Sequence, residues 1–134
     1  MKWVYKLKKN AEAQIERFKA RTVACGNEQV KFRDYVRVFA PTLEMGTARM
    51  VLSTSVKYKV PAKHFDVPNA YVNADAEEGI TIYAEFPPGI QLEEEILKGF
   101  GVQNQNQLVL VLKKSLYGLK QAGRMWNKLL NNWT

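Results

Sequence analysis

The sequence contains little cysteine and histidine, and it lacks long apolar runs. Cys25 has no disulfide partner, and His64 has no second imidazole or thiolate at a spacing that suits zinc. No apolar run approaches the roughly 20 residues that span a bilayer, and the basic N-terminus has no apolar signal core. These absences argue against a disulfide scaffold, a zinc site, secretion and membrane insertion. We therefore expect an intracellular protein without a membrane partner.

The length limits what the chain can be. Its 134 residues fit one domain or a piece of a larger one. A hydrophobic fraction of 46% beside 25% charged residues is typical of a chain that buries a core. No Ser-His-Asp set and no glycine-rich phosphate loop are visible, so the sequence gives no support to a hydrolase or a P-loop enzyme.

The charge is unevenly distributed along the chain. The formal net charge of +7 combines an acidic middle, residues 66–98 at −7, with basic flanks. The flanks are residues 1–37 at +6, 38–65 at +3 and 99–134 at +5. Lysines and arginines that neutralise phosphates release counterions, so these arms point to a polyanionic partner. A solvated charged surface is the alternative.

Alternating residues near the N-terminus predict a basic hairpin. β-Branched and aromatic residues alternate with lysine and arginine over 2–9 and 15–24, on either side of a short turn. Alternation gathers cations on one face of each strand: Lys6 and Lys8 in the first, and Arg17, Lys19 and Arg21 in the second. Such faces can line a phosphate path, and solvent-facing cations are the plainer interpretation.

The rest of the chain is predicted to be α+β. Strands are expected at 62–67, at 81–86 and at 108–112, the last of them buried on both faces because it is continuously apolar. The Pro87-Pro88-Gly89 sequence predicts a turn.

Two helices are predicted from apolar spacing. One begins with Thr47 as its N-cap, continues to about Tyr58 and packs on the core. A second, strongly amphipathic helix begins at Ala122 and continues to the last residue, with Trp133 on its apolar face. A chain that stops inside an amphipathic helix suggests truncation.

Asp66 is the first candidate for a catalytic residue. It closes the predicted strand 62–67, immediately before a Pro-Asn turn, and loops at strand ends are where sites are built. Mg²⁺ held by carboxylates and substrate phosphates is the usual arrangement for nucleotidyl transfer. One carboxylate cannot hold two ions, and a structural turn aspartate is the alternative interpretation.

Three blocks of sequence resemble the reverse transcriptase of copia-type (Ty1/copia) retrotransposons. They lie within 2–24, 66–89 and 112–122, in the family's order, and the resemblance spans essentially the whole chain. The third, Leu-Lys-Lys-Ser-Leu-Tyr-Gly-Leu-Lys-Gln-Ala, is the most specific. The resemblance implies a partial right-hand polymerase fold, with a fingers hairpin and part of an antiparallel palm sheet with packed helices. Residues 1–60 would be fingers-like and 61–134 palm-like, incomplete at the C-terminus.

The resemblance implies roles for the second block, which matches polymerase motif A. Asp66 would bind both catalytic Mg²⁺ ions, for which Mn²⁺ can substitute, and Val67 would add its backbone carbonyl. Ala70 would let the backbone approach the triphosphate. Tyr71 would be the steric gate, whose ring collides with a ribose 2′-OH. Without the resemblance, a core aromatic is the plainer interpretation of Tyr71.

The first and third blocks would complete the site. In the family's hairpin, basic residues meet the incoming triphosphate and the template. Here Lys19 and Arg21 would contact the nucleotide. The nucleic acid would be contacted by Lys6, Lys8 and Arg17. The third block resembles motif B, in which Tyr117, Gly118 and Lys120 contribute to the nucleotide pocket and the template grip. Glycine there permits a close backbone approach.

The resemblance also implies what this chain lacks. Three parts of the family's enzyme are absent from the sequence. They are the Tyr-x-Asp-Asp hairpin, which supplies two further metal-binding carboxylates, the thumb and RNase H.

The intact parent would be an RNA-directed DNA polymerase that uses an RNA or DNA template-primer and deoxynucleoside triphosphates. It would act with the rest of its polyprotein, integrase included, in the cytoplasm within virus-like particles. The 134-residue chain alone is predicted not to polymerise. The alternative is a non-catalytic remnant that binds nucleic acid through its basic arms.

Overall fold

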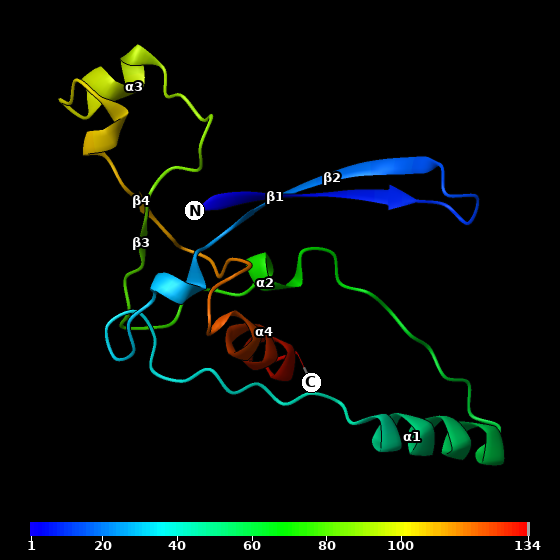
Figure 1. Ribbon diagram of the computed structural model, residues 1–134. Helices are drawn as coiled ribbons and strands as arrows, with labels where there is room; N and C mark the ends of the chain where they lie inside the picture. The colour runs from blue at the N-terminus through cyan, green and yellow to red at the C-terminus, as the bar shows by residue number, and fades with distance from the viewer. Residues whose placement is uncertain (134) are drawn as a thin grey trace.

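The computed structural model describes residues 1–133, and its longest strands form the N-terminal hairpin (Figure 1). β1 (Lys2–Lys9) pairs antiparallel with β2 (Ile15–Val23), which confirms the predicted hairpin. In the turn, the Gln14 N–H donates to Oδ1 of Asn10 at 2.9 Å, and the Asn10 N–H donates to the Gln14 carbonyl at 3.0 Å. The two strands need no other part of the chain to pair, because this local turn sets their register.

The pairing gathers the predicted cations on one face of the hairpin. Residues directly opposite one another in an antiparallel pair share a face, and the pairs here are Lys6 with Lys19, Lys8 with Arg17, and Val4 with Arg21. We call the surface formed by Lys6, Lys8, Arg17, Lys19 and Arg21 the basic face. The opposite face is apolar and largely exposed, with Tyr5 73% and Phe18 76% accessible.

The second sheet is smaller than predicted. β3 (Tyr83–Ala84) pairs antiparallel with β4 (Leu110–Val111), so the strands expected over 81–86 and 108–112 each shrink to two residues. The prediction that 108–112 is buried on both faces is wrong, since Val109 and Val111 are 55% and 44% exposed. Each strand has a single neighbour in a two-stranded sheet, so neither occupies a sheet centre.

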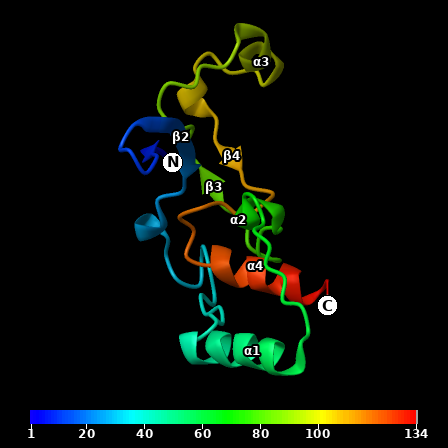
Figure 2. The ribbon, with the colours of Figure 1, turned by 90° about the vertical axis from the view of Figure 1, so that its right-hand side faces the viewer.

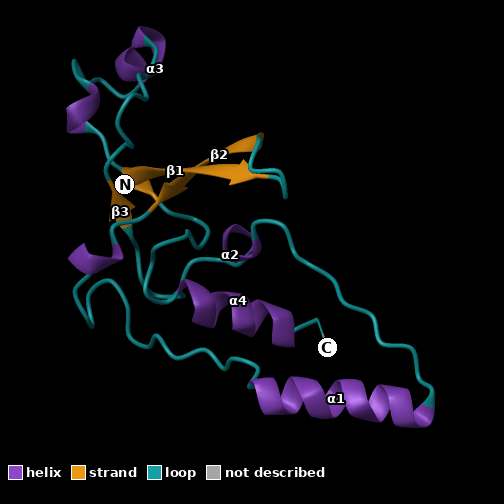
Figure 3. Cartoon of the chain, turned by 45° about the vertical axis from the view of Figure 1, so that its right-hand side comes forward, coloured by secondary structure: helices purple, strands orange, loops and turns teal. Residues whose placement is uncertain are grey.

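The strand predicted over 62–67 is also absent. This segment has no regular structure, and Asp66 therefore lies on a loop rather than at a strand end. A strand requires a partner for its backbone N–H and C=O groups, and none of the strands within residues 1–133 pairs with this segment. It runs as an extended connection between α1 (Met45–Tyr58) and α2 (Ala70–Asn73), as Figure 3 shows.

Helix α1 departs from the prediction at its start and in its packing. It begins at Met45, with Glu44 rather than Thr47 as the N-cap, and it ends before Lys59, which adopts the left-handed conformation. The expected core packing is wrong, because α1 has no buried residue and Val56 is 79% exposed. The helix lies at the end of two long extended segments, apart from both sheets (Figures 1 and 2).

Helix α4 (Ala122–Asn131) confirms the predicted amphipathic period and buries Ala122 and Met125. It ends at Asn131 instead of continuing through Trp133, and the last residue of the predicted helix, Thr134, lies outside the described residues. Helix α2 packs against α4 (Figure 2). Among residues 1–133, no helix combines the length and apolarity needed to cross a membrane.

The core lies where the two sheets and α4 meet. Its buried members are Ala24, Ile82, Leu119 and Ala122. Four half-buried side chains, Tyr71, Ile80, Leu112 and Leu116, pack against them. This cluster therefore joins the end of the hairpin, the segment after α2 and the segment before α4, which hold the three blocks recognised in the sequence.

An arm that carries α3 (Glu94–Gly99) extends beyond β3 and β4 (Figure 1). The predicted turn at its base is confirmed, since the Ile90 N–H donates to the Pro87 carbonyl at 3.4 Å and Gly89 has a φ of 84°. Trp3 ties this turn to the hairpin, because its Nε1–H donates to the Pro88 carbonyl at 2.8 Å.

Candidate nucleotide and nucleic-acid site

The charge of Asp66 acts on one cation of the basic face, Lys19. The pKa of Lys19 is lowered from its ordinary value of 10.5, chiefly because desolvation disfavours its charged form. Repulsion from Arg21, Lys8 and Arg17 lowers this pKa further, whereas the charge of Asp66 raises it. Asp66, which the resemblance assigns to motif A, therefore interacts electrostatically with Lys19. A bound polyanion would relieve the repulsion among these cations.

Arg21, Tyr117 and Tyr71 form a stack that joins the three sequence blocks. The ring centroids of Tyr71 and Tyr117 lie 4.9 Å apart with the planes tilted by 47°. The guanidinium carbon of Arg21 lies 5.0 Å from the Tyr117 ring centroid. Aromatic pairs and cation–π contacts at these distances are favourable. Three residues predicted separately to bind nucleotide are therefore neighbours in space, and we call them the Arg21–Tyr117–Tyr71 stack.

The backbone around Gly118 explains how Tyr117 is held in place. The Ala24 N–H donates to the Tyr117 carbonyl at 2.7 Å. Gly118 has a φ of 92°, and a Cβ at this position would overlap the Ala24 carbonyl oxygen. Glycine therefore permits a close approach between two protein backbones here. Its predicted approach to a nucleotide base stays a prediction.

The motif A residues lie on or beside α2. Asp66 is exposed, Val67 is half-buried, and Ala70 begins α2 just after Asn69, which has a left-handed φ of 53°. In the part of the chain that the structure describes, residues 1–133, no group of three or more His, Cys, Asp or Glu side chains could hold a metal ion. These residues alone do not fit a site for two metal ions, because Asp66 is the one carboxylate among them.

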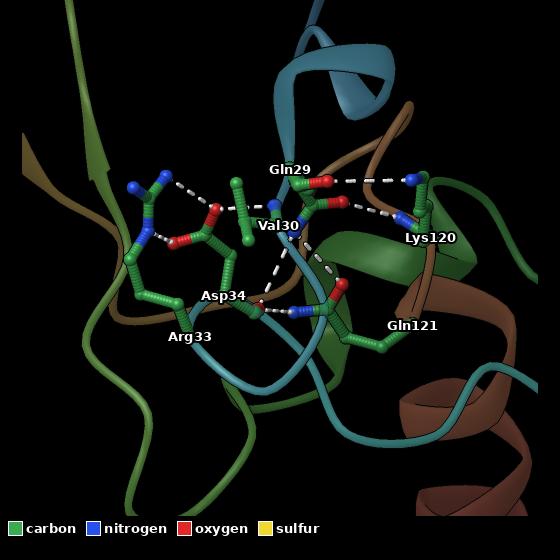
Figure 4. Close-up of polar contacts among 6 residues, drawn as sticks. All are labelled: Gln29, Val30, Arg33, Asp34, Lys120 and Gln121. Carbon is green, nitrogen blue, oxygen red and sulfur yellow. Dashed lines mark hydrogen bonds and ion pairs between the residues drawn. The ribbon is translucent and has the colours of Figure 1, made fainter.

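Lys120 contacts Gln29 (Figure 4). Its ammonium donates to the Gln29 carbonyl and the Tyr35 hydroxyl, at 3.3 Å each, and lies 4.9 Å from the Tyr35 ring centroid. Its backbone N–H donates to Oε1 of Gln29 at 2.8 Å. The structure therefore places Lys120 against the loop 29–35.

Sequence reasoning missed the polar junction shown in Figure 4, in which the fully buried Gln121 meets Gln29 and Asp34. Nε2 of Gln121 donates to the Asp34 carbonyl at 2.9 Å, and its Oε1 accepts from Nε2 of Gln29 at 3.1 Å. The Asp34 carboxylate accepts the Val30 N–H at 2.7 Å and pairs with Arg33 at 2.9 Å. Hydrogen bonding from Arg33 and Val30 lowers the pKa of Asp34. The one feature of the sequence that could have indicated this polar junction is the position of Gln121 within the third block.

A second missed feature is the ion pair between Glu77 and Arg124. The Arg124 guanidinium lies 2.8 Å from Oε1 of Glu77, whose side chain is only 11% exposed. The other oxygen, Oε2, is buried without a hydrogen-bond partner among the described residues. Nearby, Lys114 pairs with Asp75 at 2.6 Å. These contacts fasten the segment that follows α2 to α4 and to the start of the third block.

Comparison with known proteins assigns a family to this arrangement. The family model described as "Reverse transcriptase (RNA-dependent DNA polymerase)" matches residues 1–133. The Pol polyprotein of transposon TNT 1-94 from Nicotiana tabacum is 39% identical over 93% of the chain, and that of transposon RE1 from Arabidopsis thaliana is 33% identical over 98%. The Ty1-ER2 Gag-Pol polyprotein of Saccharomyces cerevisiae is 28% identical over 86%.

The chain spans 8% of the length of each of the two plant relatives and 6% of the yeast one. No solved structure matches it. These matches confirm the resemblance to copia-type retrotransposon enzymes drawn from the three sequence blocks. The chain belongs to the reverse transcriptase (RNA-dependent DNA polymerase) family.

Proposed function

We propose that this chain forms the fingers and part of the palm of a retrotransposon RNA-directed DNA polymerase. In this proposal residues 1–60 belong to the fingers and 61–134 to the palm of a right-hand polymerase fold. The intact protein adds deoxynucleotides to a primer 3′-OH along an RNA or DNA template. It works inside the cell as one part of a polyprotein, like the relatives named above.

The observation that carries the proposal is the meeting of the three sequence blocks at one place. Lys19 lies within electrostatic reach of Asp66, and Arg21 stacks on Tyr117, which contacts Tyr71. One cation of the first block therefore contacts the aromatic pair formed by the second and third blocks, and another responds to the charge of Asp66. A nucleoside triphosphate requires this combination, because its phosphates need positive charge and its sugar needs a shaped apolar contact.

The proposed division of labour follows from side-chain chemistry. The basic face binds the phosphates of template, primer and nucleotide. The Tyr71 ring lies beneath the sugar and rejects a 2′-OH, with Ala70 allowing the backbone to come close. Asp66 and the Val67 carbonyl supply ligands for Mg²⁺. The other carboxylates for two ions come from outside these residues, so the 134-residue chain alone does not extend a primer.

Primer extension by a longer product tests this function. The transcript is sequenced beyond the codon for Thr134, and the product of an uninterrupted frame is assayed on a primed RNA template. Asp66→Asn should abolish extension, because the amide is a much weaker Mg²⁺ ligand than the carboxylate. Asp75→Asn is the matched control and should retain extension, since Asp75 is 76% exposed and pairs with Lys114.

Two results would contradict the assignment. Extension that survives Asp66→Asn would remove this residue from the metal site. A stop codon before any Asp-Asp pair would instead favour the alternative function, a non-catalytic remnant that binds nucleic acid through its basic arms.

A further inference from the structure

We propose that Tyr117 is a positioning residue for sugar discrimination, because it sets the orientation of the Tyr71 ring and couples that ring to Arg21. This inference rests on the proposed function, since it assumes that Tyr71 faces the sugar of a bound nucleotide. It adds a role for Tyr117 that differs from direct nucleotide contact.

Tyr71 needs support from outside its own helix. Helix α2 has only four residues, Ala70–Asn73, and a single helical turn is too short to be stable by itself. The ring is half-buried and contacts the Tyr117 ring at a centroid distance of 4.9 Å. On the side of α4, its hydroxyl lies 3.9 Å from the position that a Cβ of Gly123 would take. Tyr117 and the start of α4 therefore bracket the ring.

Tyr117 is well placed to give that support because its own backbone is anchored. Its carbonyl accepts the Ala24 N–H at 2.7 Å, and the following Gly118 packs against the Ala24 backbone. Ala24 is itself buried in the core. A ring on a backbone anchored in this way keeps its place better than one on an isolated turn. The orientation of Tyr71 thus derives from the core through Tyr117.

Arg21 extends the contact chain to the basic face. Its guanidinium lies 5.0 Å from the centroid of the Tyr117 ring, and it shares the basic face with Lys19. Arginine binds phosphate and stacks on aromatic rings with the same planar group. A triphosphate that engages Arg21 therefore acts on Tyr117, and through Tyr117 on the Tyr71 ring.

The test compares sugar preference rather than affinity. The 134-residue chain first binds base-labelled deoxyadenosine triphosphate in the presence of Mg²⁺. Unlabelled deoxyadenosine triphosphate or adenosine triphosphate is then added, and the displacement of the labelled nucleotide is measured for each. We expect the wild type to prefer the deoxynucleotide. Tyr117→Leu should reduce this preference by about three- to tenfold, the range expected for one aromatic pair contact. Tyr117→Phe keeps the ring and should keep the preference.

Two further variants separate positioning from general damage. Tyr58→Leu, at a tyrosine that is 65% exposed on α1, should leave the preference unchanged. Arg21→Lys keeps the charge but loses the planar stacking group, and it should also lower the preference. A purely structural role of Tyr117 would weaken both nucleotides equally and leave their ratio unchanged. Circular dichroism of each variant reports whether α4 and the hairpin remain folded.

An unchanged ratio in folded Tyr117→Leu would overturn the inference, and so would a wild type without any sugar preference. Either result would leave the proposed function standing if Asp66-dependent primer extension is observed. Failure of that extension would remove the proposed function by itself, so the two failures are distinguishable.

Discussion

At the scale of single residues, the site depends on backbone geometry as much as on charged side chains. Gly118 lets the third sequence block lie against Ala24, and this contact determines where Tyr117 sits. Asp34 and Gln121 close a polar junction beside it. The residues that hold the site together are therefore distinct from those that would touch a substrate.

Replacing Gly118 with alanine tests the close backbone approach. The new Cβ would overlap the Ala24 carbonyl, and a φ of 92° is unfavourable for any L side chain. We expect Gly118→Ala to lower the free energy of unfolding by about 2 to 4 kcal/mol, measured by urea denaturation. Gly46→Ala is the control, because no atom lies within 4 Å of its Cβ position. It should increase helix content, and equal losses in both variants would contradict the account.

The charge of Asp34 predicts a pH dependence of stability. Its pKa is lowered from 3.8 by hydrogen bonds from Arg33 and the Val30 N–H. A carboxyl with a lowered folded pKa contributes stability above its unfolded pKa and loses it as the pH falls through the folded value. Wild type should therefore be more stable than Asp34→Asn at pH 6, and the difference should shrink as the pH falls below the ordinary value of 3.8 and through the lowered folded pKa. A difference that does not change with pH, in denaturant titrations across this range, would refute this role.

At the scale of elements, two contacts join the segment after α2 to its neighbours. Glu77 pairs with Arg124 of α4, and Asp75 pairs with Lys114 at the start of the third block. The first pair is mostly buried and the second is mostly exposed. The two ion pairs should therefore contribute differently to the free energy of unfolding, because water screens an exposed pair.

Removing Arg124 should be costly because it isolates a buried carboxylate. Glu77 is 11% exposed and its Oε2 already lacks a partner among the described residues. We expect Arg124→Ala to destabilise the chain by about 2 to 3 kcal/mol, below the range for fully buried pairs because Arg124 itself is partly exposed. Glu77→Gln should restore most of that loss when added to Arg124→Ala. Thermal unfolding measures both variants.

The matched control is the exposed pair between Lys98 and Glu94. Its atoms lie 3.6 Å apart at side chains that are 77% and 88% exposed. Lys98→Ala should change stability by less than about 0.5 kcal/mol. A loss as large as that of Arg124→Ala would mean that burial does not decide the strength of these pairs.

The elements also show how far sequence reasoning reaches. The hairpin was predicted correctly because its register depends on a local turn around Asn10 and Gln14. Helix α4 was predicted because apolar spacing is a property of the helix itself. The strand over 62–67 failed because a strand needs a partner, and alternation cannot say whether one pairs with it. The sequence pattern itself indicated Asp66 and the hairpin cations, whereas Tyr71 and Tyr117 were chosen by resemblance, and no pattern in the sequence indicated that these two rings would touch.

At the scale of the whole molecule, the chain is more open than its mass would suggest. Its accessible surface is 10989 Å², against about 7200 Å² expected for a compact monomer of 15.4 kDa. Large apolar side chains are exposed on α1, on the hairpin and on the arm around α3, among them Val56, Phe18 and Phe100. Large exposed apolar surfaces favour association.

We therefore predict that the isolated chain self-associates. Sedimentation should show an average mass that rises with concentration, and a dye that binds apolar surfaces should fluoresce strongly. Val51→Lys combined with Val56→Lys should reduce both effects, because the two valines are 57% and 79% exposed on α1. Ser53→Lys adds charge to the same helix without removing apolar surface and should act more weakly. A monodisperse wild type would contradict this prediction.

The central claim is that the basic face binds the phosphates of a primer–template, and the salt dependence of that binding tests it most directly. Each neutralised phosphate contributes a slope of about −0.9 to the logarithm of affinity against the logarithm of salt concentration, so the three hairpin cations predicted to meet the nucleic acid, Lys6, Lys8 and Arg17, give about −2.7. Lys8→Ala should reduce this slope by about 0.9, whereas Lys98→Ala, on the distant arm, should leave it unchanged. A slope near zero, or equal slopes for wild type and Lys8→Ala, would contradict the account.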